Sequence, residues 1–441
     1  MLFEAEGRDF AFAATGDAMI TRPLRVHRED RFLGLVNLLR SADAAFTNLE
    51  MLFHDYEGSP GFQTGTYTRS DPANLEELKW MGFQMVSCAN NHAFDYGEVG
   101  LLTTREHLRR VGLVAAGTGR NLAEARAPAY LETPKGRVAL LSVTSTFPEH
   151  ARAGDQRPDM QGRPGVSALG YQAIYTVDRE AMAHLRRISQ ALGFEEEKEY
   201  QRQFGFTGNI PQDTDTDFHF LGRKFRVGQG FAVHTLPQDG DVQDILRWVR
   251  DARRMADWVV MSLHSHESGA TRDEPAEFVR TFARLCIDNG VDIFVGHGPH
   301  FLRGIEIYKG KPIFYSLGNF IFQNDTVYKL PQDAYTRFGL GYDATPADFF
   351  EARTAGDTRG FPANPVYWET VVAVTHFRAG RLEEVRLYPC ELGVGRPRSQ
   401  RGRPLLASPE AGARCLERLA RLCQPLGTDL RLVDGVGIVR P

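Results

Sequence analysis

Five segments of the sequence each end an apolar run with a residue type that binds metal ions. They are residues 13–17, 46–50, 87–92, 261–267 and 295–300, which supply Asp17, Glu50, Asn91, His264, His297 and His300. In open α/β sheets, ligands collect where strands end, at the carboxyl edge of the sheet. Imidazole and carboxylate groups suit Zn, Mn or Fe, and additional oxygen ligands suit Ca. The five segments together predict a site for one or two divalent metal ions at strand ends.

Two of these segments carry closely spaced histidines. His264 and His266 are two residues apart, so both side chains face the same side if the strand continues. His297 and His300 flank a Gly-Pro turn that can bring both rings together. Converging imidazoles are more typical of a site than of an apolar core, and we expect all four rings near the metal.

His92 is the main candidate for acid–base chemistry. It follows Asn90 and Asn91 at the end of an apolar run, where turn-forming asparagines are unusual. Asp95 lies three residues later, and it either caps a following helix or orients the His92 ring. Both interpretations of Asp95 stay open at this point.

Arg22 is the basic side chain closest in sequence to the first candidate ligand, Asp17. A guanidinium at that position can pair with a carboxylate or a phosphate of a substrate. It can equally pair with Glu50. Arg22 is therefore a candidate for substrate binding.

Composition excludes several classes of function. The chain has 441 residues with 42% hydrophobic and 24% charged residues, and its net charge of -4 favours neither nucleic acid nor an anionic membrane. The first residues lack a basic head followed by an apolar core, and no apolar stretch has the length of a membrane span. Five cysteines without a Cys-x-x-Cys pair indicate reduced thiols. We expect a cytoplasmic protein without nucleic-acid or membrane partners.

Strands and helices alternate along most of the chain. The pattern predicts strands at 9–16, 43–49, 84–89, 257–263 and 291–296, and helices at 30–40, 71–81, 98–111, 241–255, 275–288 and 409–423. It also predicts antiparallel pairs within 128–145, 303–322 and 366–388. This alternation indicates an α/β layered architecture.

We expect a single domain over residues 1–441 with two long additions. Residues 147–225 differ in composition and form an insertion that is a lid or a wall for the substrate; an acidic surface excursion is the alternative for 195–215. Residues 323–364 form a second long loop rich in aromatic residues, which exposed loops rarely carry without a partner. A helix and tail over 405–441 complete the chain.

The motifs resemble those of the CapA family, the poly-γ-glutamate capsule-biosynthesis proteins, which have a calcineurin-like metallophosphatase fold. The matching stretches are residues 16–22, 48–50, 89–97, 296–300 and 304–322. The resemblance implies a β-sandwich flanked by helices, with the metal site at one edge. It also implies the ligand roles: Asp17, Glu50 and His300 for one metal, Glu50, Asn91, His264 and His297 for a second, and His92 as acid or base. Asn90 and Asn319 lie in the same motifs and join Arg22 as substrate-binding candidates.

Two departures from the family pattern change the expected chemistry. Metallophosphatases have Asp-x-His in the first motif, where this chain has Met19, a poor ligand for hard ions. His266 is an additional imidazole in the fourth motif. These changes favour one firmly held metal with spare bases beside it.

The leading hypothesis is a metal-dependent acid–base enzyme that epimerises a peptide Cα, with the carboxyl-terminal residue as the best candidate. Epimerisation needs one base on each face of the carbon. His92 with Asp95 is one candidate, and His266 or His300, with Asp17 or Glu267, is the other. The resemblance supports this reaction, because some CapA-like proteins encoded with lasso peptides invert the carboxyl-terminal residue. The alternatives are hydrolysis of a γ-glutamyl amide or phosphoester, and an accessory role in poly-γ-glutamate synthesis.

Overall fold

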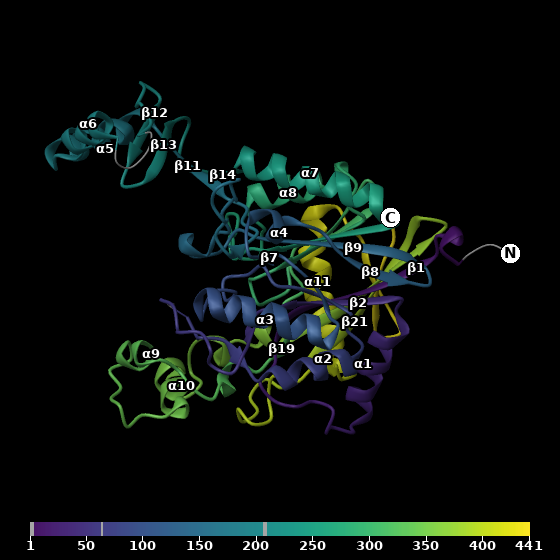
Figure 1. Cartoon of the computed structure of the whole chain (residues 1–441). Coiled ribbons are helices and arrows are strands. Elements are labelled where there is room, and N and C mark those ends of the chain that lie inside the picture. Colours follow the sequence, from purple (N-terminus) through teal and green to yellow (C-terminus); the bar gives the residue numbers. More distant parts are fainter. Residues whose placement is uncertain (1–3, 63–64, 206–209) are drawn as a thin grey trace.

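Two β-sheets pack face to face in the computed structural model, which describes residues 4–62, 65–205 and 210–441. The larger sheet has the strand order β23-β24-β21-β20-β1-β2-β5-β6, with β19 beside β1 and β22 beside β21. The smaller sheet has the order β17-β18-β16-β15-β9-β8. Alternating strands and helices supply both sheets, as the sequence pattern predicts (Figure 1).

The strands of the larger sheet are β1 (Phe10–Met19), β2 (Ala44–Leu49), β5 (Met85–Ser87), β6 (Val114–Ala116), β19 (Asn319–Phe322), β20 (Glu369–Arg378), β21 (Arg381–Glu391), β22 (Leu405–Leu406), β23 (Leu430–Val433) and β24 (Val436–Val439). Those of the smaller sheet are β8 (Ala129–Thr133), β9 (Gly136–Thr144), β15 (Trp258–His264), β16 (Ile293–His297), β17 (Ile305–Tyr308) and β18 (Lys311–Phe314). The tail predicted after the last helix is thus the β23–β24 hairpin, which extends the larger sheet.

Three apolar cores separate four layers. Between the sheets, Phe12 and Phe46 pack in the same buried cluster as Trp258 and Val260. The outer face of the larger sheet is covered by α1 (Asp30–Ser41) and α2 (Leu75–Met81), and that of the smaller sheet by α7 (Asp239–Met255) and α8 (Glu277–Asp288). Figure 1 shows these helices on opposite sides of the stacked sheets. The predicted layered α/β fold, a β-sandwich flanked by helices, is confirmed.

β1 lies in the middle of the larger sheet and brings distant parts of the chain together. It pairs in parallel with β2 and β19 and antiparallel with β20. Its register with β2 shifts between Ala14 and Asp17. A Cβ atom on Gly16 would lie 1.9 Å from the carbonyl oxygen of Gly318. Only glycine therefore permits the backbone approach that sets Asp17 beside β19.

The insertion contains a small sheet of its own. Strands β12 (Asp217–Phe220), β13 (Arg223–Val227), β11 (Tyr171–Val177) and β14 (Ala232–Pro237) lie in that order, with helices α5 (Arg179–Ala191) and α6 (Phe194–Phe204) beside them. Phe218 and Phe220 fill the core of this unit. Figure 1 shows the helices and outer strands projecting from the sandwich. We call residues 171–237 the projecting module.

The second addition is more ordered than the predicted long loop. It contains α9 (Gln332–Thr336) and α10 (Pro346–Thr354), whose buried residues pack with Leu52 and Tyr96. Buried Arg401 pairs with Asp325 and Asp357 and so anchors it to the carboxyl-terminal loop. We call residues 323–368 the arm.

The remaining helices are α3 (Gly97–Val111), α4 (Leu122–Arg126) and α11 (Pro409–Cys423). Among the described residues, no helix has both the length and the apolar character needed to cross a bilayer. All five cysteines are buried and free.

Candidate metal centre

Parallel strands of both sheets end beside the same site. Asp17 lies near the end of β1, and Glu50 directly follows β2. In the smaller sheet, His264 ends β15 and His297 ends β16, and the two residues are paired in register. The carboxyl ends of four strands therefore deliver two carboxylates and two imidazoles to one edge of the sandwich, as expected.

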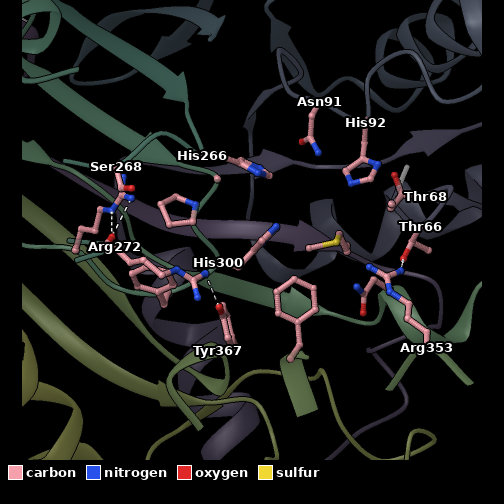
Figure 2. A pocket seen from close by; sticks show the side chains of 18 residues that line it. Thr66, Thr68, Asn91, His92, His266, Ser268, Arg272, His300, Arg353 and Tyr367 are labelled. Atoms are coloured by element: carbon pink, nitrogen blue, oxygen red, sulfur yellow. Dashed lines mark hydrogen bonds between the residues drawn. The ribbon is translucent and has the colours of Figure 1, made fainter. Parts of the chain in front are cut away.

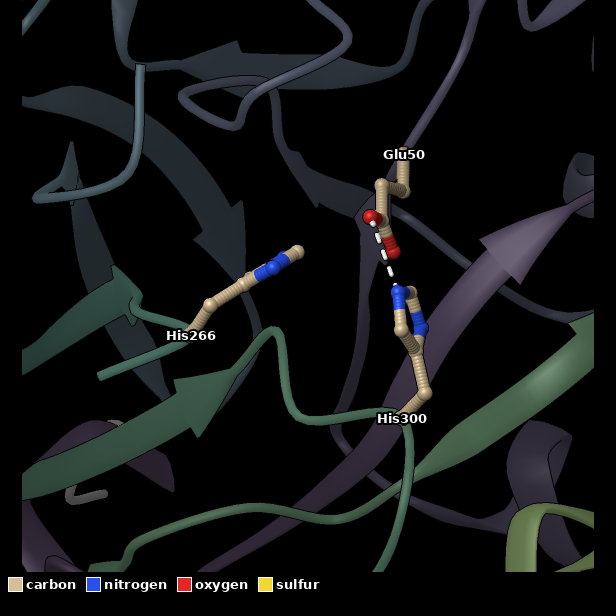
Figure 3. A group of neighbouring side chains, drawn as sticks. All are labelled: Glu50, His266 and His300. Atoms are coloured by element: carbon tan, nitrogen blue, oxygen red, sulfur yellow. Dashed lines mark ion pairs between the residues drawn. The ribbon is translucent and has the colours of Figure 1, made fainter. Parts of the chain in front are cut away.

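Two overlapping groups of side chains can each hold a metal ion. Asp17, Glu50 and His264 form one, and Glu50, His266 and His300 form the other; in each, the ligand atoms lie within 4.8 Å of one another. Figure 3 shows the second group, in which Glu50 Oε1 is 3.6 Å from His300 Nε2. Glu50 Oε1 is also 3.7 Å from His264 Nε2. Glu50 thus belongs to both groups.

Asp17 contacts His297 and His300, the two histidines of residues 295–300. Its carboxylate oxygens lie 3.4 Å from His297 Nδ1 and 3.5 Å from His300 Nδ1. Asn48, on β2, donates a 2.8 Å hydrogen bond to Asp17 Oδ1. Burial acts to raise the pKa of Asp17, but the neighbouring imidazoles of His297 and His300 hold it well below its usual range. This direction favours the carboxylate form, which is the form that binds a metal ion.

Several buried ligand atoms of the centre have no hydrogen-bond partner in the described part of the chain. They are both carboxylate oxygens of Glu50 and both ring nitrogens of His297, and both side chains are fully buried. Leaving such groups unsatisfied costs free energy. Burial, with the charges of Asp17 and Asp95, raises the pKa of Glu50 well above normal. A divalent cation would satisfy these atoms and offset the repulsion between the carboxylates, so the residues present fit a metal ion.

Burial disfavours the charged form of the His264 ring. Burial and then the charge of His266 lower the pKa of His264 well below its usual range. The Nε2 atoms of His264 and His266 lie 3.0 Å apart. His300 has a positive φ of 65°, rare for a residue with a side chain. Asn319 holds it, because its amide oxygen accepts a 2.9 Å hydrogen bond from the ring Nδ1 and its amide nitrogen donates to the carbonyl oxygen of His300.

His92 lies in a hydrogen-bonded arrangement of its own. Its Nδ1 atom is 2.7 Å from Asp95 Oδ2, which also accepts hydrogen bonds from the amide and hydroxyl of Thr68. Helix α3 begins after Tyr96 rather than at Asp95. Of the two interpretations of Asp95, the structure gives the one in which its carboxylate orients the His92 ring.

The three residues expected to bind substrate lie outside the cavity beside the metal centre. Asn90 donates to the carbonyl of Leu49 and accepts from the amide of His92, so it positions that loop. Asn319 positions His300. Arg22 donates to the carbonyls of Arg398, Ser399 and Arg401, so the structure does not bring it to the site. Its guanidinium binds the carboxyl-terminal loop, which lies more than 370 residues away in the sequence, so the sequence could not predict this contact.

A cavity of about 280 Å³ opens beside the metal centre. Figure 2 shows His92, His266 and His300 on its wall, and Asn91 and Met19 also line it. The sequence analysis missed its other polar lining residues, which are Thr66, Thr68, Ser268, Arg272, Arg303, Asn324, Arg353 and Tyr367. Arg303 falls between two of the family-like stretches, residues 296–300 and 304–322, but nothing in the pattern marks Arg272 or Arg353, because they reach the site from loops and the arm.

The two additions differ in their relation to this cavity. The arm contributes Asn324, Arg353, Phe361 and Tyr367 to the wall. None of the described residues of 147–225 lines it. A larger groove of about 1240 Å³, between the projecting module and α8, shares Ser268 with the cavity. The described residues of the insertion therefore border the neighbouring groove and do not line the cavity beside the metal centre.

A helix-flanked β-sandwich with Asp, Glu and His gathered at its strand ends defines the metallophosphatase-like class of α/β proteins. The chain belongs to the bacterial capsule synthesis protein family PGA_cap, which matches residues 11–324. The match contains all of the candidate metal ligands and His92, and it ends as the arm begins.

Individual relatives agree with this assignment. The chain is 39% identical to the Uncharacterized protein y4sH of Sinorhizobium fredii, over 98% of this chain and 93% of that protein. It is 26% identical to the PGA biosynthesis protein CapA of Bacillus subtilis, over 74% of this chain and 70% of CapA. The Probable polyglutamine synthesis accessory protein Rv0574c of Mycobacterium tuberculosis is 24% identical over 57% of this chain and 49% of its own length.

Proposed function

We propose that this protein is a metal-dependent acid–base enzyme that acts on a peptide-type substrate and epimerises a Cα atom, with the carboxyl-terminal residue as the candidate position. One observation carries the proposal: a carboxylate-oriented histidine outside the metal groups, His92, faces the same cavity as His300. Because Nδ1 of His92 is hydrogen-bonded to Asp95, Nε2 is the ring nitrogen that can exchange a proton with a substrate.

His300 is the better partner base than His266. The Nδ1 atom of His300 is hydrogen-bonded to Asn319 at 2.9 Å and also lies 3.5 Å from Asp17, so its ring is oriented and has a carboxylate beside it. Glu267, the other expected orienting residue, accepts hydrogen bonds from Ser145, Thr146 and Ser265 instead. In the proposed reaction, one histidine removes the Cα proton and the other delivers a proton to the opposite face, so the peptide keeps its mass.

A bound divalent ion would supply positive charge to offset the negative charge that develops on the substrate carbonyl. Asp17, Glu50, His264 and His297 would hold it, with Asn91 at the cavity wall. Met19 lines the cavity at the position where a metallophosphatase has a histidine. This supports one firmly held ion and a site used for proton transfer rather than for a two-metal phosphoester hydrolysis.

The second candidate is a role in poly-γ-glutamate synthesis, as an accessory protein or as a hydrolase of γ-glutamyl amides. Membership of the capsule synthesis family and the likeness to CapA, a PGA biosynthesis protein, and to Rv0574c, a probable polyglutamine synthesis accessory protein, favour the accessory role. We propose the cytoplasm as the compartment for either function, because five free, buried cysteines suit a reducing environment.

Incubation of the metal-loaded protein with candidate peptides in heavy water separates these functions. Epimerisation incorporates one deuterium at the inverted carbon and changes the configuration found by chiral amino-acid analysis, without shortening the peptide. Release of glutamate, a shorter peptide or phosphate, with no deuterium at Cα, would contradict the epimerase and favour the hydrolase. Both γ-linked glutamate oligomers and α-linked peptides with a free carboxyl terminus belong in the panel.

A further inference from the structure

The cavity beside the metal centre continues into a second cavity of about 420 Å³. The two share five lining residues, which are Arg272, Asn324, Arg353, Phe361 and Tyr367. Four of the five belong to the arm. These residues form the boundary between the two spaces, so a substrate at the metal centre meets the arm directly.

The lining of these cavities is positively charged. Arg272, Arg303 and Arg353 line the first, and among the described residues no Asp or Glu lines it. In the second, the described acidic lining residue is Asp325, whose carboxylate pairs with Arg401. An anionic group of a substrate is the natural complement to this surplus of positive charge.

The three arginines differ in how many hydrogen bonds and ion pairs their guanidinium groups form within the protein. Arg303 is buried and donates to the carbonyls of Glu267 and Arg272, so its donors hold a loop in place. Arg353 donates to the hydroxyl of Thr66 and lies 6.0 Å from the Phe349 ring, and it forms no ion pair with any described residue. Since a guanidinium has five N–H donors, Arg353 keeps most of them for a ligand.

The positive charge of Arg353 is not balanced by an ion pair with any described acidic side chain. Burial lowers its pKa, and the like charge of Arg337 adds to this effect. A half-buried guanidinium with no counter-ion is costly, and a bidentate carboxylate is its best partner. Arg272, which donates to the Tyr367 hydroxyl, is more exposed and keeps its full access to water. The unsatisfied charge therefore resides chiefly at Arg353.

The position of Arg353 fits recognition close to the chemistry. Figure 2 shows Arg353 with Thr66 on the side of the cavity where His92 and Thr68 lie. Arg272 and Ser268 lie on the opposite side, beyond His266 and His300. A carboxylate held at Arg353 would leave the rest of a peptide extending past His300 toward Ser268.

We propose that Arg353, together with the Thr66 hydroxyl, binds a carboxylate of the substrate and so selects peptides with an acidic group near the reacting carbon. The carboxylate is either the carboxyl terminus of the peptide or an acidic side chain, since both offer the same two oxygens. This inference rests on the proposed function only in taking a peptide as the substrate.

Four small peptides test it by calorimetry. Acetyl-Ala-Ala-Glu carries both a terminal and a side-chain carboxylate, and the carboxyl-terminal amide of this peptide keeps only the side-chain carboxylate. Acetyl-Ala-Ala-Gln carries only the terminal carboxylate. The carboxyl-terminal amide of acetyl-Ala-Ala-Gln carries no carboxylate. Wild type should bind acetyl-Ala-Ala-Glu, and the singly charged peptide whose carboxylate the site reads, at least about tenfold more tightly than the neutral one. Arg353→Gln should abolish this preference, and Arg353→Lys should restore part of it. Arg187→Gln, which changes an exposed arginine of α5 that lines neither cavity, is the matched control.

The singly charged peptides identify the source of the carboxylate, because Arg353→Gln should weaken only the one that the site reads. Equal binding of all four peptides by wild type, including no measurable binding of any, would overturn the proposal. So would an equal loss for charged and neutral peptides in Arg353→Gln with an unchanged circular dichroism spectrum. Because these measurements record binding and not turnover, a failed epimerase assay leaves their result intact.

Discussion

The Nε2 atoms of His264 and His266 face each other at 3.0 Å, one ring fully buried and the other at the solvent-exposed mouth of the cavity. One proton at most can lie between them, because two N–H groups cannot point at each other at this distance. Glu50 Oε1 lies 3.7 Å from His264 Nε2, so the pair links the buried part of the metal centre to the open cavity.

The metal centre should depend on the buried histidines more than on any other imidazole. His264→Ala and His297→Ala should each lower metal affinity by more than about tenfold, because each removes a ligand from a buried cage. Metal content measured by mass spectrometry after equilibration at fixed free ion concentration checks this. His184→Ala, on the exposed face of α5, is the control. Full occupancy in His264→Ala would show that the cage is assigned wrongly.

His92 should be needed for chemistry and not for the metal. His92→Ala should slow deuterium incorporation at Cα by about 10²- to 10⁴-fold, the range typical of a general acid or base, while metal content stays unchanged. Asp95→Asn should lower the rate by about 10- to 100-fold, since it loses the carboxylate that fixes the ring. If His92→Ala lost its metal in parallel with its activity, His92 would be a ligand instead.

The projecting module should be dispensable for the metal centre. Thr176 and Ala232 are paired across β11 and β14, so a short turn from Val177 to Ala232 can replace residues 178–231 without disturbing the hairpin ends. We expect full metal content and unchanged turnover of short peptides, with weaker binding of longer peptides that reach the groove. Loss of turnover for a dipeptide or tripeptide would show that the module closes over the site after all.

Arg401 should anchor the arm. Its side chain is 2% exposed and pairs with Asp325 and Asp357, and removing one partner of a buried ion network costs about 3–5 kcal/mol. Arg401→Met should lower the free energy of unfolding in urea by about that amount. Arg157→Met, which removes an exposed pair with Asp159, should change it little. Equal effects of the two substitutions would place the arm's anchor elsewhere.

The cysteines should be inert in the native protein. Burial raises the pKa of Cys88 and Cys415 to about 12 and that of Cys423 to about 11, and it raises those of Cys286 and Cys390 as well. Since the thiolate is the reactive form, labelling with a disulfide reagent at pH 8 should be slow and should accelerate as the pH rises further. Urea should release five reactive thiols. One rapidly labelled native thiol would indicate an accessible site.

The sequence predicted the layered α/β architecture well because the strands are buried on both faces and their apolar runs are continuous; the sandwich itself was implied by the family resemblance. Asp17 and His297 end such runs, and parallel strands bring them to a shared edge. The sequence left the two roles of Asp95 open, because the choice depends on the local geometry around His92.

What the sequence could not give was the non-local part of the site. Arg353 reaches the cavity from a helix more than 280 residues away from Thr66 in the chain, and no periodicity connects them. Arg22 was included wrongly for the reverse reason. It is close to Asp17 in the sequence, but its side chain binds the carboxyl-terminal loop and does not reach the site. The aromatic residues Phe218 and Phe220 suggested a substrate wall, but they form the core of a separate small unit.

The placement of β1 has a consequence for biosynthesis. This strand is made well before its partners β19 and β20. Asp17 consequently cannot meet His297 and His300 until about 280 further residues have been added to the chain. Premature termination before β16 would yield a chain that lacks His297 and His300, so retention of a metal ion at this site would report on synthesis beyond that point.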